Sequence, residues 1–534
     1  MQTAEGLREL AWLYLKAGLK YLAQDLALRA QERSGGADPE LERLFEALRL
    51  PVGRRRTTVV DYDPASLGPV PEGSPPLPRP QGHPRPADLQ RWKRLELEAR
   101  YLELDEALFA EAGVDDLARL SPDAAWELCR TLRRLKLFRW ESYVTSATPH
   151  DPRSAVRFAV LNGADPEKVA SVAEAAGASA AARHLAVALW TTREVFYQRD
   201  PRVRLRAQEL LSAIDPASLD LEGRVERSVA RVVCALDAEE LPPIRALLPE
   251  LDALLVEPGL KDGQAQELLE YRALALRAVG DYPEALRTYR AVLTFSPLQP
   301  DYLAWAAWCG GMQGSPEVTL PCARTLQSAL PRSEFSYVAG LGLAALTAYR
   351  PQAVPSLVRR REELLDRGTE YCRALVHAGK PCAQFALPLC RLAVLLSRWE
   401  HLEALAEFGA SKTADPRPFH TYRAIAAMER TRDPAQGPRA VPEASWPYVQ
   451  LGLRCWDLRR GLPPASVTAE AERTLAEHPD DPGLALVAAE AFALAGDTAR
   501  ARALWEQARN QLDALGSRQL EVHFAAEWQG RLGD

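Results

Sequence analysis

A short pattern of apolar, glycine and small residues recurs along this chain, and it constrains the fold more than any other feature of the sequence. In residues 268–297, apolar residues at helical spacing lead to Gly280-Asp281-Tyr282, and a second such run ends at Pro297. Glycine permits the left-handed conformation that closes a helix. Ala285 would let two helix backbones come close, and Tyr289 lies one turn later on the same face. The pattern predicts two antiparallel helices.

Several other segments repeat these offsets. Pro297 and Pro331 are 34 residues apart, which predicts one further unit over residues 300–333. Residues 88–260 match the pattern poorly, and only their helical spacing supports repeats there. The marker residues of the other copies are Tyr14, Gly18 and Ala23, then Ala404, Phe408 and Pro416, and finally Phe492, Gly496, Ala501 and Trp505.

These segments resemble tetratricopeptide (TPR) repeats, in which a 34-residue unit forms two antiparallel helices. The resemblance implies an all-α fold, an α-solenoid of antiparallel helix pairs whose neighbours stack around a shared core. It also implies that side chains of the first helices line a groove that engages peptides or other proteins. An irregular helical solenoid without the geometry of this family would show much of the same spacing.

The distribution of prolines and repeats divides the chain into five predicted parts. Nine prolines lie between residues 64 and 86, and because proline fixes φ and lacks an N–H group, neither a helix nor a central strand is expected there. One of these stretches, Pro75 to Pro78, also fits the P-x-x-P pattern of SH3 ligands. The parts are a helical segment at 1–50, a Pro-rich linker at 51–87, degenerate repeats at 88–260, TPR-like repeats at 261–440, and further repeats at 441–534 that end in a capping helix near 517–531.

Composition narrows the possible partners and the compartment. A net charge of −6 and a pI of about 5.9 make nucleic acid an unlikely main partner. No run of about 18 apolar residues predicts a membrane span. The eight scattered cysteines fit reduced core thiols in a cytoplasmic protein better than a disulfide framework. Arginine outnumbers lysine and only two asparagines are present, which suggests a GC-rich, bacterial genome.

Two clusters invite a chemical interpretation, and both are better explained by packing. Cys372, His377, Cys382 and Cys390 are spaced more widely than the ligands of structural zinc sites. The glycines of Gly340-Leu341-Gly342 resemble a dinucleotide fingerprint, but no strand precedes them, so close helix packing is expected. Protease, hydrolase and P-loop motifs do not occur in the sequence. We therefore expect no metal, no cofactor, no catalytic residue and no enzymatic activity.

The sequence thus favours a non-catalytic scaffold or adaptor that binds a protein or peptide. Trp12 and Trp190 are candidate anchors for such a partner, since tryptophan often dominates binding interfaces. The carboxylate clamp of chaperone-binding TPR proteins needs asparagines that this chain lacks at such positions. A regulatory sensor for a small molecule or signalling peptide is the alternative, and an enzyme with an unrecognised residue set is a third. The oligomeric state does not follow from the sequence.

Overall fold

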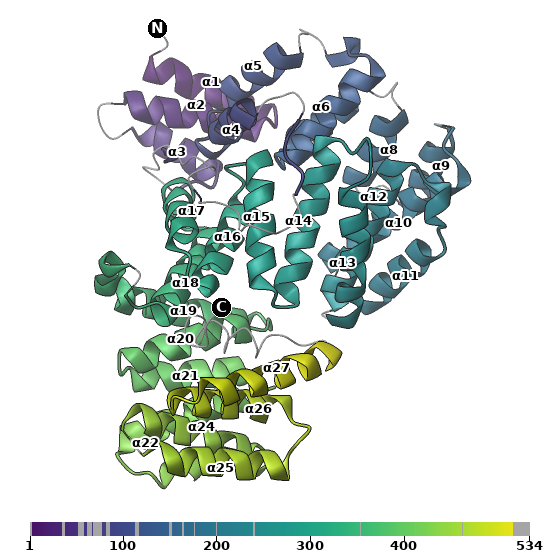
Figure 1. Cartoon of the computed structure of the whole chain (residues 1–534). Coiled ribbons are helices and arrows are strands. Elements are labelled where there is room, and N and C mark those ends of the chain that lie inside the picture. Colours follow the sequence, from purple (N-terminus) through teal and green to yellow (C-terminus); the bar gives the residue numbers. More distant parts are fainter. Residues whose placement is uncertain are drawn as a thin grey trace.

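Helices make up all of the regular structure that can be described. The computed structural model describes residues 3–34, 38–51, 58–60, 67, 77–81, 86–112, 117–148, 152–162, 165–175, 177–198, 200–238, 241–352, 354–411, 413, 415–439, 441–461 and 463–515. Within these ranges the chain contains no β-strand. Helices that follow one another in the sequence pack side by side, and Figure 1 shows them stacked into a curved array. The predicted all-α solenoid of antiparallel helix pairs is confirmed.

The first half of the array packs small groups of helices against one another. Its helices are α1 (Ala4–Lys16), α2 (Lys20–Arg33), α3 (Pro39–Ala47), α4 (Pro86–Leu97), α5 (Tyr101–Ala112), α6 (Pro122–Arg134), α7 (Phe138–Ala147), α8 (Pro152–Leu161), α9 (Pro166–Ala175), α10 (Ala180–Gln198), α11 (Pro201–Ser212), α12 (Leu221–Ala238) and α13 (Leu241–Leu255), with short 3₁₀ turns η2 (Leu117–Arg119) and η3 (Pro216–Ser218). The start of α6 follows from its sequence, because Ser121 caps it and Pro122 holds its first position.

The second half continues the stacking and contains the clearest sequence repeats. Its helices are α14 (Asp262–Ala278), α15 (Tyr282–Phe295), α16 (Pro300–Gln313), α17 (Pro316–Ala329), α18 (Glu334–Tyr349), α19 (Arg361–His377), α20 (Ala383–Leu395), α21 (Trp399–Ala410), α22 (Arg417–Thr431), α23 (Gln436–Arg439), α24 (Trp446–Arg459), α25 (Pro464–Glu477), α26 (Pro482–Leu494) and α27 (Thr498–Leu515), with 3₁₀ turns η4 (Pro355–Arg360) and η5 (Glu443–Ser445). The capping helix predicted near 517–531 lies outside the described residues. None of the described helices is long and apolar enough to cross a membrane.

One kind of turn closes many of these helices. After α14, Gly280 has a φ of 80°, its N–H donates to the carbonyl of Arg277 at 3.1 Å, and the next N–H, of Asp281, donates to Leu276 at 2.9 Å. These bonds satisfy carbonyls that the end of a helix leaves without partners. In this turn a residue with a positive φ is followed by a residue whose N–H donates to the carbonyl five positions earlier. Within the described ranges, the turn occurs at ten residues: Gly18, Arg49, Ala99, Lys136, Gly177, Gly280, Gly314, Gly379, Ser397 and Gly496.

Ala99 shows how such a turn can escape notice in the sequence. Residues 89–112 have the pattern of one helix, but α4 ends at Leu97 and α5 begins at Tyr101. Ala99 lies between them with a φ of 55°, and Arg100 N–H closes the turn onto Leu95. Alanine carries no turn signal, so the sequence pattern predicts one helix over 89–112, and that prediction is wrong.

The main core runs through the second half of the array, where α16 and α18 come into backbone contact. A Cβ atom added to Gly342 would lie 2.3 Å from the carbonyl oxygen of Ala307, and one added to Gly311 would lie 2.0 Å from that of Gly342. Only glycine allows this approach, which confirms close helix packing as the role of Gly342. Trp308 and Tyr302 of α16 are fully buried in the same core.

The Pro-rich segment contacts the array at the places where it can be described. Val59 and Leu67 are buried in the main core. The backbone of Val60 bonds to Ser328 and Thr325 of α17, and Gln81 N–H donates to Asp262 at the start of α14. The N-terminal helices also pack directly on α5, so 51–87 separates them from the array in sequence but not in space. The five-part division remains a prediction.

Candidate binding site

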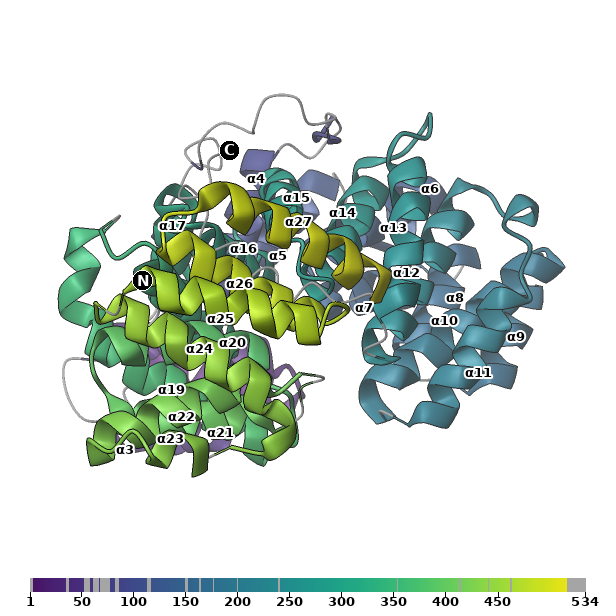
Figure 2. The ribbon, with the colours of Figure 1, turned by 60° about the horizontal axis from the view of Figure 1, so that its bottom comes forward.

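Helices α6 to α14 curve round until their two ends meet. Besides its sequence neighbours, α6 contacts α14, although about 130 residues separate them. Figures 1 and 2 both show α12 beside α14, with α8 to α11 beyond α12 as seen from α14. A cavity of about 710 Å³ lies inside this curve, lined by α6, α7, α8, α10, α12 and α14. We call it the inner cavity.

Both charged and apolar side chains line the inner cavity. The apolar wall comes from α8, α10 and α12 and includes Leu189, Val225 and Val229. The cations are Arg130, Arg133, Arg134, Lys136, Arg157 and Arg193, and the carboxylates are Glu222, Glu226, Glu267 and Glu270. The lining thus holds six cations and four carboxylates, in a chain whose net charge is −6, and two carboxylates outside the lining, Glu141 and Asp301, also pair with its cations.

Lys136 holds the two ends of the curve together. It occupies the left-handed turn after α6, with a φ of 53°, and its ammonium lies 2.5 Å from Glu270 of α14 and close to Asp301 of α16. Its Nζ also lies 5.0 Å from the centre of the Tyr302 ring. Burial would lower the pKa of Lys136, but the neighbouring carboxylates, Glu270 first, raise it well above its ordinary value. The lysine is therefore a permanent cation at this closure.

A second set of ion pairs fixes the arginines on the inner face of α6. Glu141 of α7 is fully buried, and its carboxylate accepts bonds from Arg133 at 3.2 Å and Arg157 at 2.9 Å. Burial raises the pKa of Glu141, but the two guanidinium groups outweigh it and hold the pKa below its usual value. Nη2 of Arg133 is buried and has no hydrogen-bond partner. A buried guanidinium N–H without an acceptor marks a polar site rather than a passive core.

Arg134 is the least compensated cation of the inner cavity. It is 7% exposed, and its Nε donates to Gln266 at 3.2 Å. Its Nη2 is buried without a hydrogen-bond partner, and no described carboxylate lies within ion-pair distance of it. Burial lowers the pKa of Arg134 accordingly. A buried cation without a directly paired carboxylate favours the approach of an anionic group.

Glu226 adds less negative charge to the lining of the inner cavity than an ordinary glutamate would. It lies 3.5 Å from Arg133, yet burial raises the pKa of Glu226 to about 7. Near neutral pH this carboxyl group is therefore protonated about half of the time. The electrostatic surface of the inner cavity is suited to a ligand with acidic groups.

The two tryptophans predicted as partner anchors lie on different helices, and neither is a lining residue of this cavity. Trp12 is partly buried against the cluster formed by α1 to α3. Trp190 packs with α8 and α9, and its Nε1 is buried without a hydrogen-bond partner. Its neighbours Leu189 and Thr192 line the inner cavity, but Trp190 is not among the lining residues.

The repeat markers occupy helix ends and the contacts between paired helices. Tyr282, Ala285, Tyr289 and Pro297 are buried, and Asp281 caps α15 by accepting from Glu284 N–H. Gly18 and Gly496 occupy left-handed turns as Gly280 does, and Ala23 and Ala501 lie four residues after the caps of α2 and α27, as Ala285 does after Asp281. Tyr14 and Trp505 are partly buried, and Phe492 is buried. These roles are architectural.

The fourth copy has a different register from the one its sequence suggests. Counted from Arg398, which precedes α21, the positions equivalent to Ala285 and Tyr289 are Leu402 and Ala406, both buried. Ala404 and Phe408 lie two residues later and are only partly buried, and Pro416 directly precedes α22. Ala404 and Pro416 are twelve residues apart in the sequence, as Ala285 and Pro297 are. This equal spacing therefore does not locate equivalent helix positions here.

The cysteine cluster packs into the core around α19 and α20. Cys372, Cys382 and Cys390 are buried free thiols, and Cys382 donates to the carbonyl of Phe408 at 3.4 Å. A hydrogen bond with the neighbouring Cys382 thiol, and burial after it, raise the pKa of Cys372. No group of three or more possible metal ligands comes together among the residues that the structure describes.

Sequence reasoning missed the residues that line the inner cavity. The available signal was the basic run from Arg130 to Lys136, which covers the last turn of α6, with buried Cys129 and Leu132, and the turn after it. Basic residues at this spacing usually mark a solvated face. Only the closure of α6 onto α14 turns that face inward.

Comparisons with known proteins add little to this picture. No protein-family model matches the sequence, and no curated protein matches it. One solved structure, described as "Structure of Naa15/Naa10 bound to HypK-THB", matches over 95% of this chain at 14% sequence identity, with a TM-score of 0.20. The match spans 63% of that structure's chain. The support for the solenoid fold is the helix packing itself.

Proposed function

We propose that this chain is a TPR-like, non-catalytic scaffold or adaptor that binds an acidic segment of a protein or peptide in the inner cavity. The observation that carries the proposal is the positive lining of that cavity within an acidic chain. Stacked helical repeats commonly bind partners on the inner face of their curve. Complementary charge would select the partner and speed its association more than it would raise the affinity.

Several side chains support an acidic ligand in particular. Arg134 has no carboxylate partner, and Nη2 of Arg133 has no acceptor. Arginine binds carboxylates through planar, paired hydrogen bonds. The apolar wall around Val225 and Val229 would accept the aliphatic parts of the same segment.

A regulatory sensor for a small molecule is the second candidate, and the size of the inner cavity favours it. Ligand sites for small molecules commonly measure about 300–1,000 Å³, and the inner cavity measures about 710 Å³. The closure of α6 onto α14 through Lys136 would then connect ligand binding to the shape of the array. An anionic metabolite is the class that the lining would take.

A cavity-filling substitution tests the proposal. Ser142 of α7 lines the cavity, and the next residue, Tyr143, is 56% exposed and points elsewhere. Ser142→Trp should fill the cavity, whereas Tyr143→Trp adds an indole on the outer side of the same helix and is the matched control. Both variants and the wild type are tagged, expressed in the source organism and purified with their bound proteins, which are identified by mass spectrometry.

The two candidates predict different results. If a protein is bound at stoichiometric amounts by the wild type and by Tyr143→Trp but not by Ser142→Trp, the scaffold is supported. If no protein depends on Ser142, the scaffold proposal fails. Thermal melting against a panel of anionic metabolites then decides for the sensor, which requires a rise in melting temperature that Ser142→Trp abolishes.

A further inference from the structure

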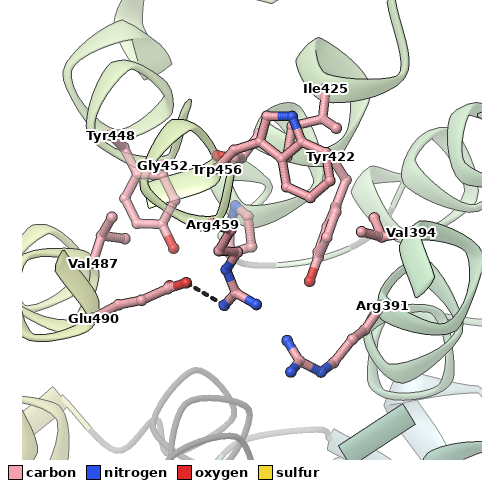
Figure 3. A pocket seen from close by; sticks show the side chains of 12 residues that line it. Arg391, Val394, Tyr422, Ile425, Tyr448, Gly452, Trp456, Arg459, Val487 and Glu490 are labelled. Atoms are coloured by element: carbon pink, nitrogen blue, oxygen red, sulfur yellow. Dashed lines mark hydrogen bonds and ion pairs between the residues drawn. The ribbon is translucent and has the colours of Figure 1, made fainter. Parts of the chain in front are cut away.

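Two pockets of the array differ in how firmly their arginines are held. Figure 3 shows the smaller one, of about 80 Å³ between α20, α22, α24 and α26, where Arg459 donates to Glu490 at 2.7 Å. In the inner cavity, Arg133 instead divides its guanidinium group between two carboxylates, Glu141 and Glu226. These two carboxylates hold Arg133 with unequal strength, and the weaker one decides how an anion can bind there.

Glu141 is the firmer partner of Arg133. Its carboxylate is fully buried and accepts from Nε of Arg133 at 3.2 Å and from Nε of Arg157 at 2.9 Å. Both are charge-assisted hydrogen bonds, which favour the ionised form of a carboxylate. Arg133 and Arg157 are therefore tied to Glu141 whatever else enters the cavity.

Glu226 of α12 is the weaker partner. Its carboxylate lies 3.5 Å from Nη1 of Arg133, which is an ion-pair distance but too long for a good hydrogen bond. It makes no other ion pair or hydrogen bond with the residues that the structure describes. The Glu226 side chain is 24% exposed and lines the inner cavity, so solvent protons can reach it.

The surroundings of Glu226 oppose its negative charge. Burial in the cavity wall has the largest effect and raises its pKa, and the carboxylates of Glu222 on the same helix and Glu267 of α14 raise it further. Arg133 of α6 and Arg157 of α8 act in the opposite direction and do not outweigh them. A carboxylate held in this way takes up a proton when a further negative charge comes near.

The other helices that pack on α12 add no free charge beside Glu226. These helices are α10, α11 and α13. The charged groups that they direct toward this region have partners of their own: Arg193 with Glu194, Arg204 with Asp237, and Glu250 with Arg231. The charge of Glu226 is therefore set by the groups of α6, α8, α12 and α14 named above.

Protonation of Glu226 changes what Arg133 can bind. While Glu226 is ionised, Arg133 and Arg157 face two carboxylates, and once it is neutral they share Glu141 alone. We infer that an acidic group bound in the inner cavity takes the place of Glu226 beside Arg133, and that Glu226 then accepts a proton from the solvent. The inference rests on the proposed function of the cavity and adds its regulation, because binding should strengthen as the pH falls.

The size of the effect follows from the pKa of Glu226, which is about 7. The protonated fraction of such a group falls about tenfold between pH 6 and pH 8, so an acidic ligand should bind about tenfold tighter at pH 6. At pH 7 the free protein is half protonated, and each bound ligand should take up about half a proton. The described lining of the inner cavity contains no histidine that would titrate in the same range.

Titration calorimetry on the full chain measures both quantities. The probe is the peptide Glu-Glu-Leu-Glu-Glu, acetylated and amidated so that only side-chain carboxylates are charged, and these stay ionised between pH 6 and pH 8. The same peptide with glutamine in place of glutamate is the uncharged control and should bind at least about tenfold more weakly. Titrations at pH 7 in imidazole and in MOPS, which differ in their heats of protonation, give the number of protons taken up.

Two variants assign the proton to Glu226. Glu226→Gln keeps the side chain neutral, so it should bind the probe at pH 8 about as tightly as the wild type does at pH 6, without proton uptake. Asp237→Asn is the matched control, because it removes a carboxylate of the same helix that pairs with Arg204 and does not line the cavity. It should keep the affinity of the wild type and its pH dependence.

The outcomes separate this inference from the proposed function. If the wild type does not bind the acidic peptide at millimolar concentration at either pH, the proposed function fails and the inference fails with it. Binding that is equally tight at both pH values, or tighter at pH 8, overturns the inference alone, as does proton uptake that persists in Glu226→Gln. Melting curves show whether each variant is folded, and the proton uptake of the wild type decides the question without any variant.

Discussion

The two halves of the array use the same helical hairpin but fill its inner face differently. In α16 and α18, small residues bring the helix backbones into contact at Gly311 and Gly342, and the space between them is closed. In α6 and α14, the corresponding contact is made by long polar side chains such as Arg134 and Gln266, and a cavity of about 710 Å³ remains beside it. Side-chain size on the inner face therefore decides whether a pair of neighbouring hairpins forms a core or a binding cavity.

The largest expected effect comes from disturbing the tight half. Gly342→Ala would place a Cβ 2.3 Å from the carbonyl oxygen of Ala307, so α16 and α18 must move apart. We expect a loss of about 3 kcal/mol or more in the free energy of unfolding, measured by urea denaturation, because backbone atoms cannot shift as a flexible side chain can.

The same helix offers a matched control. Gly340 is two residues away, and an added Cβ there would meet no atom within 4 Å. Gly340→Ala should stabilise the protein by up to about 1 kcal/mol, since alanine is the better helix former. Equal effects at the two glycines would show that backbone contact does not hold this half together.

A somewhat smaller effect is expected where the open half closes on itself. Lys136→Met removes the cation between Glu270 and Asp301 and leaves two partly buried carboxylates side by side. We expect a loss of about 2–3 kcal/mol in unfolding free energy, since breaking a buried ion pair leaves an uncompensated charge. Hydrogen exchange in α6 and α14 should increase at the same time, because Lys136 links the two helices.

Lys261→Met is the control for this closure. Lys261 pairs with Glu127 at 2.7 Å across the same two ends of the curve, but both side chains are more than half exposed. Exposed pairs contribute little, so a loss below about 1 kcal/mol is expected. If Lys261→Met lowered the unfolding free energy as much as Lys136→Met, the charge pairing between the two ends, and not the burial of the pair, would explain the loss.

The third effect depends on pH and belongs to the open half alone. Glu226 has a pKa of about 7 against an ordinary value of 4.5, so the folded chain holds this proton more tightly than the unfolded chain does. The stability contributed by the group is complete below pH 4.5 and is lost as the pH rises through 7. Glu226→Gln should match the wild type at pH 4 and exceed it by about 2–3 kcal/mol at pH 8, as measured by urea unfolding at both values. A constant difference across this range would contradict the assignment.

The comparison of the halves also explains what could be predicted from the sequence. The fold was predictable because Gly280, Ala285 and Pro297 mark a hairpin by their own conformational limits. The turn at Ala99 was not, because its left-handed conformation is imposed by the packing of α4 and α5 and not by the residue. The inner cavity was not predictable either, since Lys136 and Glu270 are 134 residues apart and meet only when the curve closes.

The smallest effect tests the turns that the halves share. Gly496 has a φ of 89° and open space around it, so Gly496→Ala should cost about 1 kcal/mol through backbone conformation alone. Ala99 has a φ of 55° in the open half, and Ala99→Gly should recover part of that energy. The stability gained in Ala99→Gly should be smaller than the stability lost in Gly496→Ala, because the buried Ala99 methyl group is lost from the cluster around Phe45. Urea unfolding of both variants measures the difference, and a gain from Ala99→Gly equal to the loss from Gly496→Ala would show that the methyl group contributes nothing to packing.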